Sequence, residues 1–187
     1  MEASAADTNT WTQFRLLTEI DRIFRQARIR FWLRGGWALD FLIGQITRSH
    51  SDIDLVTWRR HARRVQGLLE NSGYQVGTIT GLAAMHFLKD GQDVGFAFIK
   101  KDEQGRFVTP GREVWPWPPF PLAKKVLEGI ACRTMSAAAL LEEKENYEKY
   151  SGRPLRPKDR ESIRALRALR SAPRRTPPGP PTRPPDA

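Results

Sequence analysis

Residues 34–40 of the chain read RGGWALD and residues 50–55 read HSDIDL, so a glycine pair is followed closely by two aspartates one residue apart. On a β-strand, residues i and i+2 point to the same face, so Asp52 and Asp54 are expected side by side while Ile53 turns into the core. Adjacent like charges repel each other, and a divalent cation offsets that repulsion. Magnesium prefers oxygen ligands, commonly one or two carboxylates completed by substrate phosphates and water. The pair therefore predicts a Mg²⁺ site that also binds a polyphosphate.

The glycine pair predicts the second half of such a site. The apolar residues 31–33 favour a buried strand, and Gly35 and Gly36 favour a tight turn after it. Residues 37–42 then predict the start of a helix. A Gly-Gly turn at a helix N-terminus lets backbone N–H groups come close to a phosphate, and the helix dipole favours the negative charge. Taken singly, the turn and the two carboxylates each have an ordinary structural explanation, but their order and spacing favour a phosphate-binding turn that faces a metal site.

Composition limits the classes of protein to consider. The 187 residues suit one domain, or a domain with a small appendage, and 40% of them are apolar, which is enough for a globular core. Lysine and arginine outnumber aspartate and glutamate by 31 to 21, so the basic surfaces predict anionic ligands such as a nucleotide or nucleic acid. Cys132 is the single cysteine, which excludes an intrachain disulfide and favours a reducing, cytoplasmic location. No apolar run approaches the roughly 20 residues of a membrane helix, so we expect no membrane partner.

Hydrophobic periodicity predicts an α+β fold with a mixed sheet. Alternating or β-branched runs favour strands at residues 52–58, 74–79, 85–88 and 94–99, and the last two are joined by the hairpin signal KDGQ. Amphipathic patterns favour helices at residues 11–27, 59–71, 136–150 with Ser136 as N-cap, and 157–170. The predicted organisation is a disordered N-terminus 1–10, an α/β domain 11–134, a C-terminal helical part 135–171 and a Pro/Arg-rich disordered tail 172–187.

The segment GGWALDFLIGQITRSHSDIDL, residues 35–55, resembles the signature of the nucleotidyltransferase superfamily with the DNA polymerase β-like fold, particularly its aminoglycoside 2″-adenylyltransferase and lincosamide nucleotidyltransferase branch. A looser likeness continues through VTPGREVWPWP and LLEEKENYEKYSGRPLRPKD in the second half. The resemblance implies a mixed β-sheet with flanking helices, followed by a short C-terminal helical part. It also implies transfer of a nucleoside monophosphate from a nucleoside triphosphate, with ATP the favoured donor, to a hydroxyl of a small-molecule acceptor such as an antibiotic, with release of pyrophosphate.

The resemblance assigns catalytic and phosphate-binding roles to the opening motif. Asp52 and Asp54 would hold Mg²⁺ ions, which neutralise charge on the transferring phosphoryl group and align the attacking and leaving oxygens. Gly35 and Gly36 would form the turn that binds the nucleotide phosphates.

Four basic residues are further candidates for nucleotide binding. Arg48 and His50 match a TRxH segment of the family and would contact the triphosphate, although pairing with Asp40 is the alternative for Arg48. Lys144 and Lys158 lie in the helical part that would close over the nucleotide, although lysines on helix surfaces are mostly solvated.

One position departs from the family pattern. A third carboxylate, at once metal ligand and base for the acceptor hydroxyl, is expected on the strand near residues 91–99, where our alignment places Gly95. Asp93 shares the face of Gly95 on a regular strand but is displaced by roughly 6–7 Å along it. A bulge at the glycine, or a match to the family pattern shifted by two residues, would let Asp93 serve as the third catalytic residue, and the alternative is that Asp93 merely ends a hairpin.

Two classes of function remain open from the sequence. The first is a Mg²⁺-dependent nucleotidyltransferase, and the net charge of +10 favours a neutral or anionic acceptor over a strongly cationic one. The second is a catalytically weakened nucleotide- or RNA-binding protein of the same fold, for which the basic residues 153–170 supply a surface. A nucleotidyltransferase that modifies proteins or RNA ends is a further possibility, which would join this basic surface to an intact site. His61 and His86 are isolated in the sequence and are interpreted as structural. The loop 115–118 is interpreted as core packing or as a stacking platform.

Overall fold

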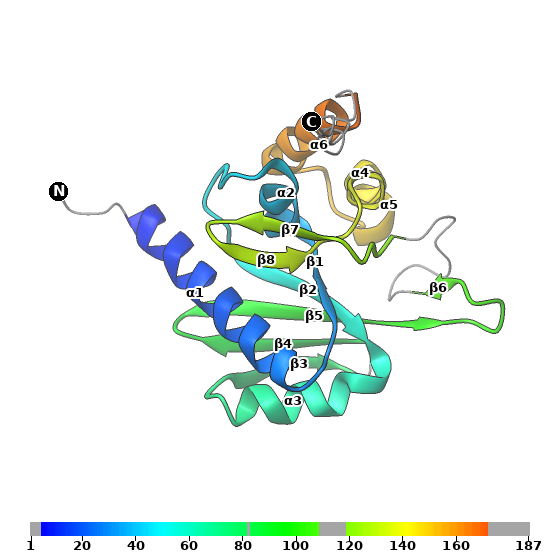
Figure 1. Ribbon diagram of the computed structural model, residues 1–187. Coiled ribbons are helices and arrows are strands. Elements are labelled where there is room, and N and C mark those ends of the chain that lie inside the picture. Colours follow the sequence, from blue (N-terminus) through cyan, green and yellow to red (C-terminus); the bar gives the residue numbers. More distant parts are fainter. Residues whose placement is uncertain (1–4, 82, 109–118, 172–187) are drawn as a thin grey trace, which may run out of the picture.

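The computed structural model describes residues 5–81, 83–108 and 119–171 (Figure 1). Two features predicted from the sequence, the tail 172–187 and the loop 115–118, lie outside the described residues. Among the residues that are described, no helix is long and apolar enough to cross a membrane.

A six-stranded mixed sheet forms the centre of the molecule. The strand order is β1-β2-β5-β4-β3, with β6 paired to the end of β5, and a separate β7-β8 hairpin contacts β1 (Figure 1). β2 and β5 run parallel, whereas the other pairs are antiparallel, which confirms the predicted mixed sheet. The strands are β1 Phe31–Leu33, β2 Asp52–Trp58, β3 Gln75–Thr80, β4 Ala84–Lys89, β5 Gln92–Lys101, β6 Phe107–Val108, β7 Lys124–Leu127 and β8 Ile130–Arg133.

The helices lie in two groups. α1 crosses one face of the sheet and α3 lies beside β3, whereas α2, α4, α5 and α6 gather on the side of β1, near the β7-β8 hairpin (Figure 1). The second group holds the C-terminal helical part, and its Leu140 and Leu166 belong to the same hydrophobic cluster as Trp37 of α2. The helices are α1 Ala5–Gln26, α2 Gly35–Ile43, the 3₁₀ turn η1 Arg59–His61, α3 Ala62–Glu70, α4 Ala137–Glu145, α5 Tyr147–Ser151 and α6 Pro157–Ser171.

The two faces of the central sheet differ in character. Leu55 on β2 lies in register with Phe96 on β5; both are buried, and the Phe96 ring centroid is 5.7 Å from that of Phe24 on α1. Side chains alternate along a strand, so Asp52 and Asp54 point to the opposite face, away from α1. The strand that carries the carboxylates is therefore anchored by its apolar residues, as the sequence predicts.

The N-terminal segment differs from the prediction of disorder over residues 1–10, because α1 begins at Ala5. Its first turns are held by contacts to a distant loop: Asn9 Nδ2 donates to the carbonyl of His50 over 2.8 Å, and Thr10 is buried. These residues carry no apolar stripe, so periodicity could not reveal a helix that tertiary contacts stabilise.

Two further elements differ from the prediction. The helix expected over residues 136–150 is broken at Asn146 into α4 and α5, although the predicted N-cap is present, with Ser136 Oγ accepting from the N–H of Ala139. The β7-β8 hairpin was not predicted. Its strands turn at Glu128 and Gly129, which both have positive φ, and the non-glycine residue at the first of these positions makes the turn hard to recognise from the sequence.

Candidate functional site

Asp52 and Asp54 begin β2, where the strand leaves the loop that follows α2. In the parallel pairing with β5, Asp52 lies opposite Asp93 and Asp54 lies opposite Gly95. Asp52 is exposed and Asp54 is partly buried. Within the part of the chain that the structure describes, neither carboxylate makes a hydrogen bond or an ion pair. Two like charges on neighbouring positions therefore lack the direct partners that a structural carboxylate usually has.

The glycine turn packs directly against this pair. Gly35 has a positive φ of 65°, and a Cβ at that position would lie 2.6 Å from Oδ2 of Asp54. The N–H of Arg34 donates to the carbonyl of Asp54 over 2.9 Å, which ties the start of α2 to β2. A Cβ at Gly36 would run into the ring of His50 and would lie 3.0 Å from Nη2 of Arg48. Both glycines are thus needed for close packing, and the predicted phosphate contact would use the same open backbone.

His50 is held behind the turn rather than in front of it. Its side chain is 2% exposed, and Nε2 lies 2.6 Å from Oδ2 of Asp40, which is fully buried. Asp40 also accepts from the hydroxyl of Thr47 over 2.6 Å, so the alternative that Asp40 pairs with Arg48 is wrong. This geometry favours a supporting role for His50 over the direct triphosphate contact that the sequence predicted. Arg48 donates to the carbonyl of Ser49 and lies beside Gly36, where a phosphate is expected.

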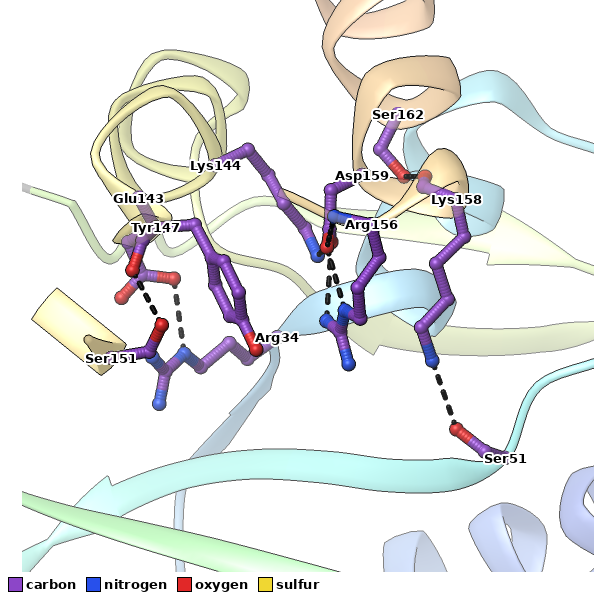
Figure 2. A network of polar contacts seen from close by, with 10 residues as sticks. All are labelled: Arg34, Ser51, Glu143, Lys144, Tyr147, Ser151, Arg156, Lys158, Asp159 and Ser162. Carbon is purple, nitrogen blue, oxygen red and sulfur yellow. Dashed lines mark hydrogen bonds and ion pairs between the residues drawn. The ribbon is translucent and has the colours of Figure 1, made fainter. Parts of the chain in front are cut away.

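The C-terminal helices bring basic side chains to the same corner (Figure 2). Lys144 on α4 and Arg156, just before α6, both bind Asp159, at 2.6 Å and 2.7 Å. Lys158 on α6 reaches Ser51 Oγ at 3.2 Å, immediately before the first aspartate of β2. Figure 2 shows these three basic side chains on the side of α6 that faces the start of β2. Lys144 and Lys158, which were predicted from the sequence, are brought together with Arg156, which was not.

Arg34 supplies a further cation from the turn itself. Its Nε donates to Oε2 of Glu143 over 3.0 Å, and this salt bridge joins α2 to α4 (Figure 2). The neighbouring Glu143 raises the pKa of Arg34, an effect that burial opposes and Asp54 reinforces. The sequence signal for Arg34 was its position directly before the glycine pair, but its partner lies 109 residues away and could not be deduced.

Asp54 and Asp159 have opposite pKa shifts. Burial raises the pKa of Asp54, Arg34 and Lys144 lower it, and the like charge of Asp52 adds to the increase. Burial would also raise the pKa of Asp159, but hydrogen bonds from Arg156 and Lys144 outweigh it and hold that pKa far below its ordinary value. The charge of Asp159 is therefore compensated by the fold, whereas that of Asp54 is compensated only in part.

These residues fit a Mg²⁺ site of the kind that a substrate completes. Among the described residues, no group of three or more His, Cys, Asp or Glu side chains is arranged to hold a metal ion. Asp52 and Asp54 would therefore supply two carboxylate ligands, and triphosphate oxygens and water would supply the others. The raised pKa of Asp54 reflects a partly buried negative charge that such a cation would offset.

The expected position of a third carboxylate is occupied by glycine in a regular strand. β5 pairs with β2 and with β4 without a register shift at Asp93 or Gly95, so the bulge that would let Asp93 take this place is absent from these strands. The side chain of Asp93 instead lies 3.1 Å from Nδ1 of His86. His86 was interpreted as structural, but it projects from the face that carries the aspartates. The position of His86 depends on the register of β4 against β5, and an isolated histidine in the sequence gives no information on that register.

Sequence comparisons identify related proteins. The aminoglycoside-2″-adenylyltransferase family profile matches residues 16–166. A lincosamide resistance protein of Staphylococcus haemolyticus is 35% identical over 68 residues, which cover 36% of this chain and 42% of that protein. A 2″-aminoglycoside nucleotidyltransferase of Klebsiella pneumoniae is 32% identical over 65 residues, which cover 35% of this chain and 37% of that protein. The matched segments thus span about two fifths of the length of these curated relatives.

Solved structures extend the similarity to most of the chain. The lincomycin-bound lincosamide antibiotic adenylyltransferase LnuA has a TM-score of 0.66 at 24% identity, covering 82% of this chain and 95% of that chain. ANT(2″)-Ia in complex with adenylyl-2″-tobramycin has a TM-score of 0.69 at 21% identity, covering 85% of this chain and 95% of that chain. At these identities the structures confirm the predicted fold. With the match of the family profile over residues 16–166, the chain belongs to the aminoglycoside-2″-adenylyltransferase family of nucleotidyltransferases.

Proposed function

We propose that the protein transfers a nucleoside monophosphate from a nucleoside triphosphate to a hydroxyl of a small-molecule antibiotic, with Mg²⁺ as cofactor and release of pyrophosphate. One observation carries the proposal: among the described residues, Asp52 and Asp54 have no bonded partner at the start of β2, although basic side chains lie close to them. Lys158 reaches the adjacent Ser51, and the charges of Arg34 and Lys144 act on Asp54. Mg²⁺ would offset the charges of the two aspartates, and the triphosphate would offset the charges of the basic side chains.

Each part of the site has a role in this reaction. Mg²⁺ bound by Asp52 and Asp54 would neutralise charge on the α-phosphoryl group. Lys158, which reaches Ser51 beside Asp52, would bind the outgoing pyrophosphate. Gly35 and Gly36 would offer backbone N–H groups at the start of α2. The relative crystallised with an adenylylated product supports ATP as the donor.

The charges around the site favour a neutral acceptor. Two nearby carboxylates, Glu143 and Asp159, are already bound to Arg34 and Lys144, so they leave little negative charge for a polycation. Lincomycin, which has a single basic amine, therefore suits the site better than tobramycin, which has several.

The product of the reaction provides the test. We would incubate the protein with Mg²⁺, each of the four nucleoside triphosphates and either lincomycin or tobramycin, and analyse the acceptor by mass spectrometry. The expected result is a lincomycin adduct whose mass increases by one AMP, together with one pyrophosphate per adduct. Modified tobramycin with unmodified lincomycin would contradict the acceptor preference, and failure of both acceptors with every nucleotide would contradict the proposed activity.

The basic surface of α6 supports RNA binding as a second candidate. Arg160 and Arg164 line a surface groove together with Leu155, outside the contacts to the aspartates. Binding of single-stranded RNA through such residues should weaken with salt at a logarithmic slope of about −0.7 per contacted phosphate. Nucleotidyl transfer to a small molecule should instead depend mainly on Mg²⁺, so a salt titration separates the two.

A further inference from the structure

The aspartate-bearing face of the sheet also carries an imidazole next to the second aspartate. His86 on β4 lies in register with Gly95 on β5, and Gly95 lies in register with Asp54 on β2. Residues in register on adjacent strands point to the same face. The three positions therefore form a row across the sheet, and the middle position has no side chain.

Because Gly95 has no side chain, the side chains of His86 and Asp54 both border the space that a side chain at this position would fill. A Cβ at Gly95 would lie 3.1 Å from Cε1 of His86 and 3.5 Å from Oδ1 of Asp54. The edge of the imidazole, with Nδ1 at 3.4 Å, thus covers the Cβ position of Gly95, and the carboxylate of Asp54 borders the same position. An acceptor hydroxyl that approaches a nucleotide bound at Asp54 would pass beside this ring.

Asp93 fixes the orientation of the imidazole. Nδ1 of His86 lies 3.1 Å and 3.3 Å from the two carboxylate oxygens of Asp93. A carboxylate accepts hydrogen bonds, so the neutral ring carries its proton on Nδ1 and presents the lone pair of Nε2. Among the described residues, Nε2 has no hydrogen-bond partner, and the side chain is 45% exposed. The free nitrogen is therefore accessible to a substrate.

We propose that His86 is the base for the acceptor hydroxyl and that Asp93 is its positioning residue; this inference rests on the proposed nucleotidyl transfer. Nε2 accepts the hydroxyl proton while the acceptor oxygen forms its bond to the α-phosphorus. The bond between the α-phosphorus and the oxygen that bridges to the β-phosphate breaks, and pyrophosphate leaves with that electron pair. The imidazolium then releases its proton to solvent, since the ring is exposed.

Asp93 itself is less suited to this role. It lies opposite Asp52 rather than Asp54, and both of its oxygens are within 3.3 Å of His86. A hydroxyl that reached Asp93 would have to displace the imidazole, whereas Nε2 is already free. The geometry therefore assigns proton transfer to the histidine.

The test compares two histidines of this chain. His61 lies on η1, beyond the opposite end of β2, so His61→Ala is a matched control for His86→Ala. Pyrophosphate release from Mg-ATP would be measured with lincomycin or tobramycin as acceptor, with and without added imidazole, and Mg-ATP binding would be measured by calorimetry. We expect His86→Ala to lower kcat by about 10²–10⁴-fold, the usual contribution of a general base, with unchanged Mg-ATP affinity. Imidazole should restore part of the rate, and His61→Ala should behave as the native protein.

The outcomes distinguish this inference from the proposed function. An unchanged kcat in His86→Ala would overturn the role of His86. The same conclusion would follow if kcat fell together with Mg-ATP affinity and imidazole did not restore the rate. Absence of pyrophosphate release by the native protein with either acceptor would instead overturn the nucleotidyl transfer on which the inference rests.

The role of Asp93 has its own test in a double variant. Asp93→Asn should lower kcat without changing the KM for ATP, because it disturbs only the orientation of the ring. If Asp93 acts through His86, the variant His86→Ala/Asp93→Asn should be no slower than His86→Ala, since residues that act as a unit are not additive. Multiplied losses in the double variant would show that Asp93 acts independently.

Discussion

The sheet and the C-terminal helices each contribute a carboxylate to one corner of the molecule, and the surroundings of these two carboxylates shift their pKa values in opposite directions. Asp159 on α6 has a fully buried side chain, yet it receives hydrogen bonds from Lys144 and Arg156, which keep its pKa far below the ordinary value. Asp54 on β2 is only partly buried, but it has Asp52 as its neighbour and its pKa is raised. Groups whose environments shift their pKa values apart commonly have different tasks. We therefore assign Asp159 to stabilising the fold and propose that Asp54 binds the ligand.

Asp54→Asn should have the largest effect on activity and a favourable effect on stability. Loss of a metal ligand costs several kcal/mol of transition-state stabilisation, so pyrophosphate release should fall by about 10³-fold or more. The midpoint of thermal unfolding without Mg²⁺ should rise, because removal of a poorly compensated charge stabilises the folded state. An active variant, or one with a lower midpoint, would show that the charge of Asp54 serves the fold instead.

Asp159→Asn should have the reverse profile, with its main effect on stability. It leaves Lys144 and Arg156 without their charged partner, which should cost about 2–3 kcal/mol of unfolding free energy, less than for a fully buried pair because Arg156 is 44% exposed. Urea unfolding measures this loss. An unchanged midpoint would contradict the assignment of Asp159 as the structural carboxylate.

The pH dependence of stability should distinguish the same two carboxylates. The lowered pKa of Asp159 gives a stabilisation that is complete above the ordinary Asp pKa of about 3.9 and is lost as the pH falls below it. The native protein should therefore lose stability more steeply below pH ~4 than Asp159→Asn does. The raised pKa of Asp54 has the opposite sign, so the advantage of Asp54→Asn should grow as the pH rises above ~4. Urea midpoints of the three proteins across this range measure both trends.

The smallest expected effects concern two lysines, one that faces the ligand and one that supports the fold. Lys158 is bonded to the hydroxyl of Ser51, so Lys158→Met should raise the KM for ATP by about 2–5-fold, as for an exposed ion pair, with little change in stability. Lys144 binds Asp159 and is 18% exposed, so Lys144→Met should lower the unfolding midpoint as well. Equal stability losses in the two variants would remove the distinction between a lysine that supports the fold and one that faces the ligand.

Features that depend on neighbouring residues could be predicted from the sequence, whereas features that depend on contacts between distant residues could not. Gly35, Gly36, Asp52 and Asp54 lie within one strand, turn, helix and strand unit, so their relative placement follows from chain geometry. The pairing of Lys144 with Asp159 depends on how α4 packs against α6, and the approach of His86 to Asp54 depends on the register of three strands. The helical start of α1 likewise depends on hydrogen bonds from Asn9 to a loop some forty residues away.

Nucleotide binding by the native protein and Asp54→Asn is the most direct test of the central claim, because it requires no knowledge of the acceptor. Calorimetry with ATP would be carried out with and without Mg²⁺, with Asp159→Asn as the control that retains both β2 carboxylates. We predict that ATP binds the native protein tightly with Mg²⁺ and weakly without it, and that Asp54→Asn loses this difference while Asp159→Asn keeps it. ATP binding that is indifferent to Mg²⁺, or a Mg²⁺ effect that survives in Asp54→Asn, would contradict the assignment of this face as the metal and nucleotide site.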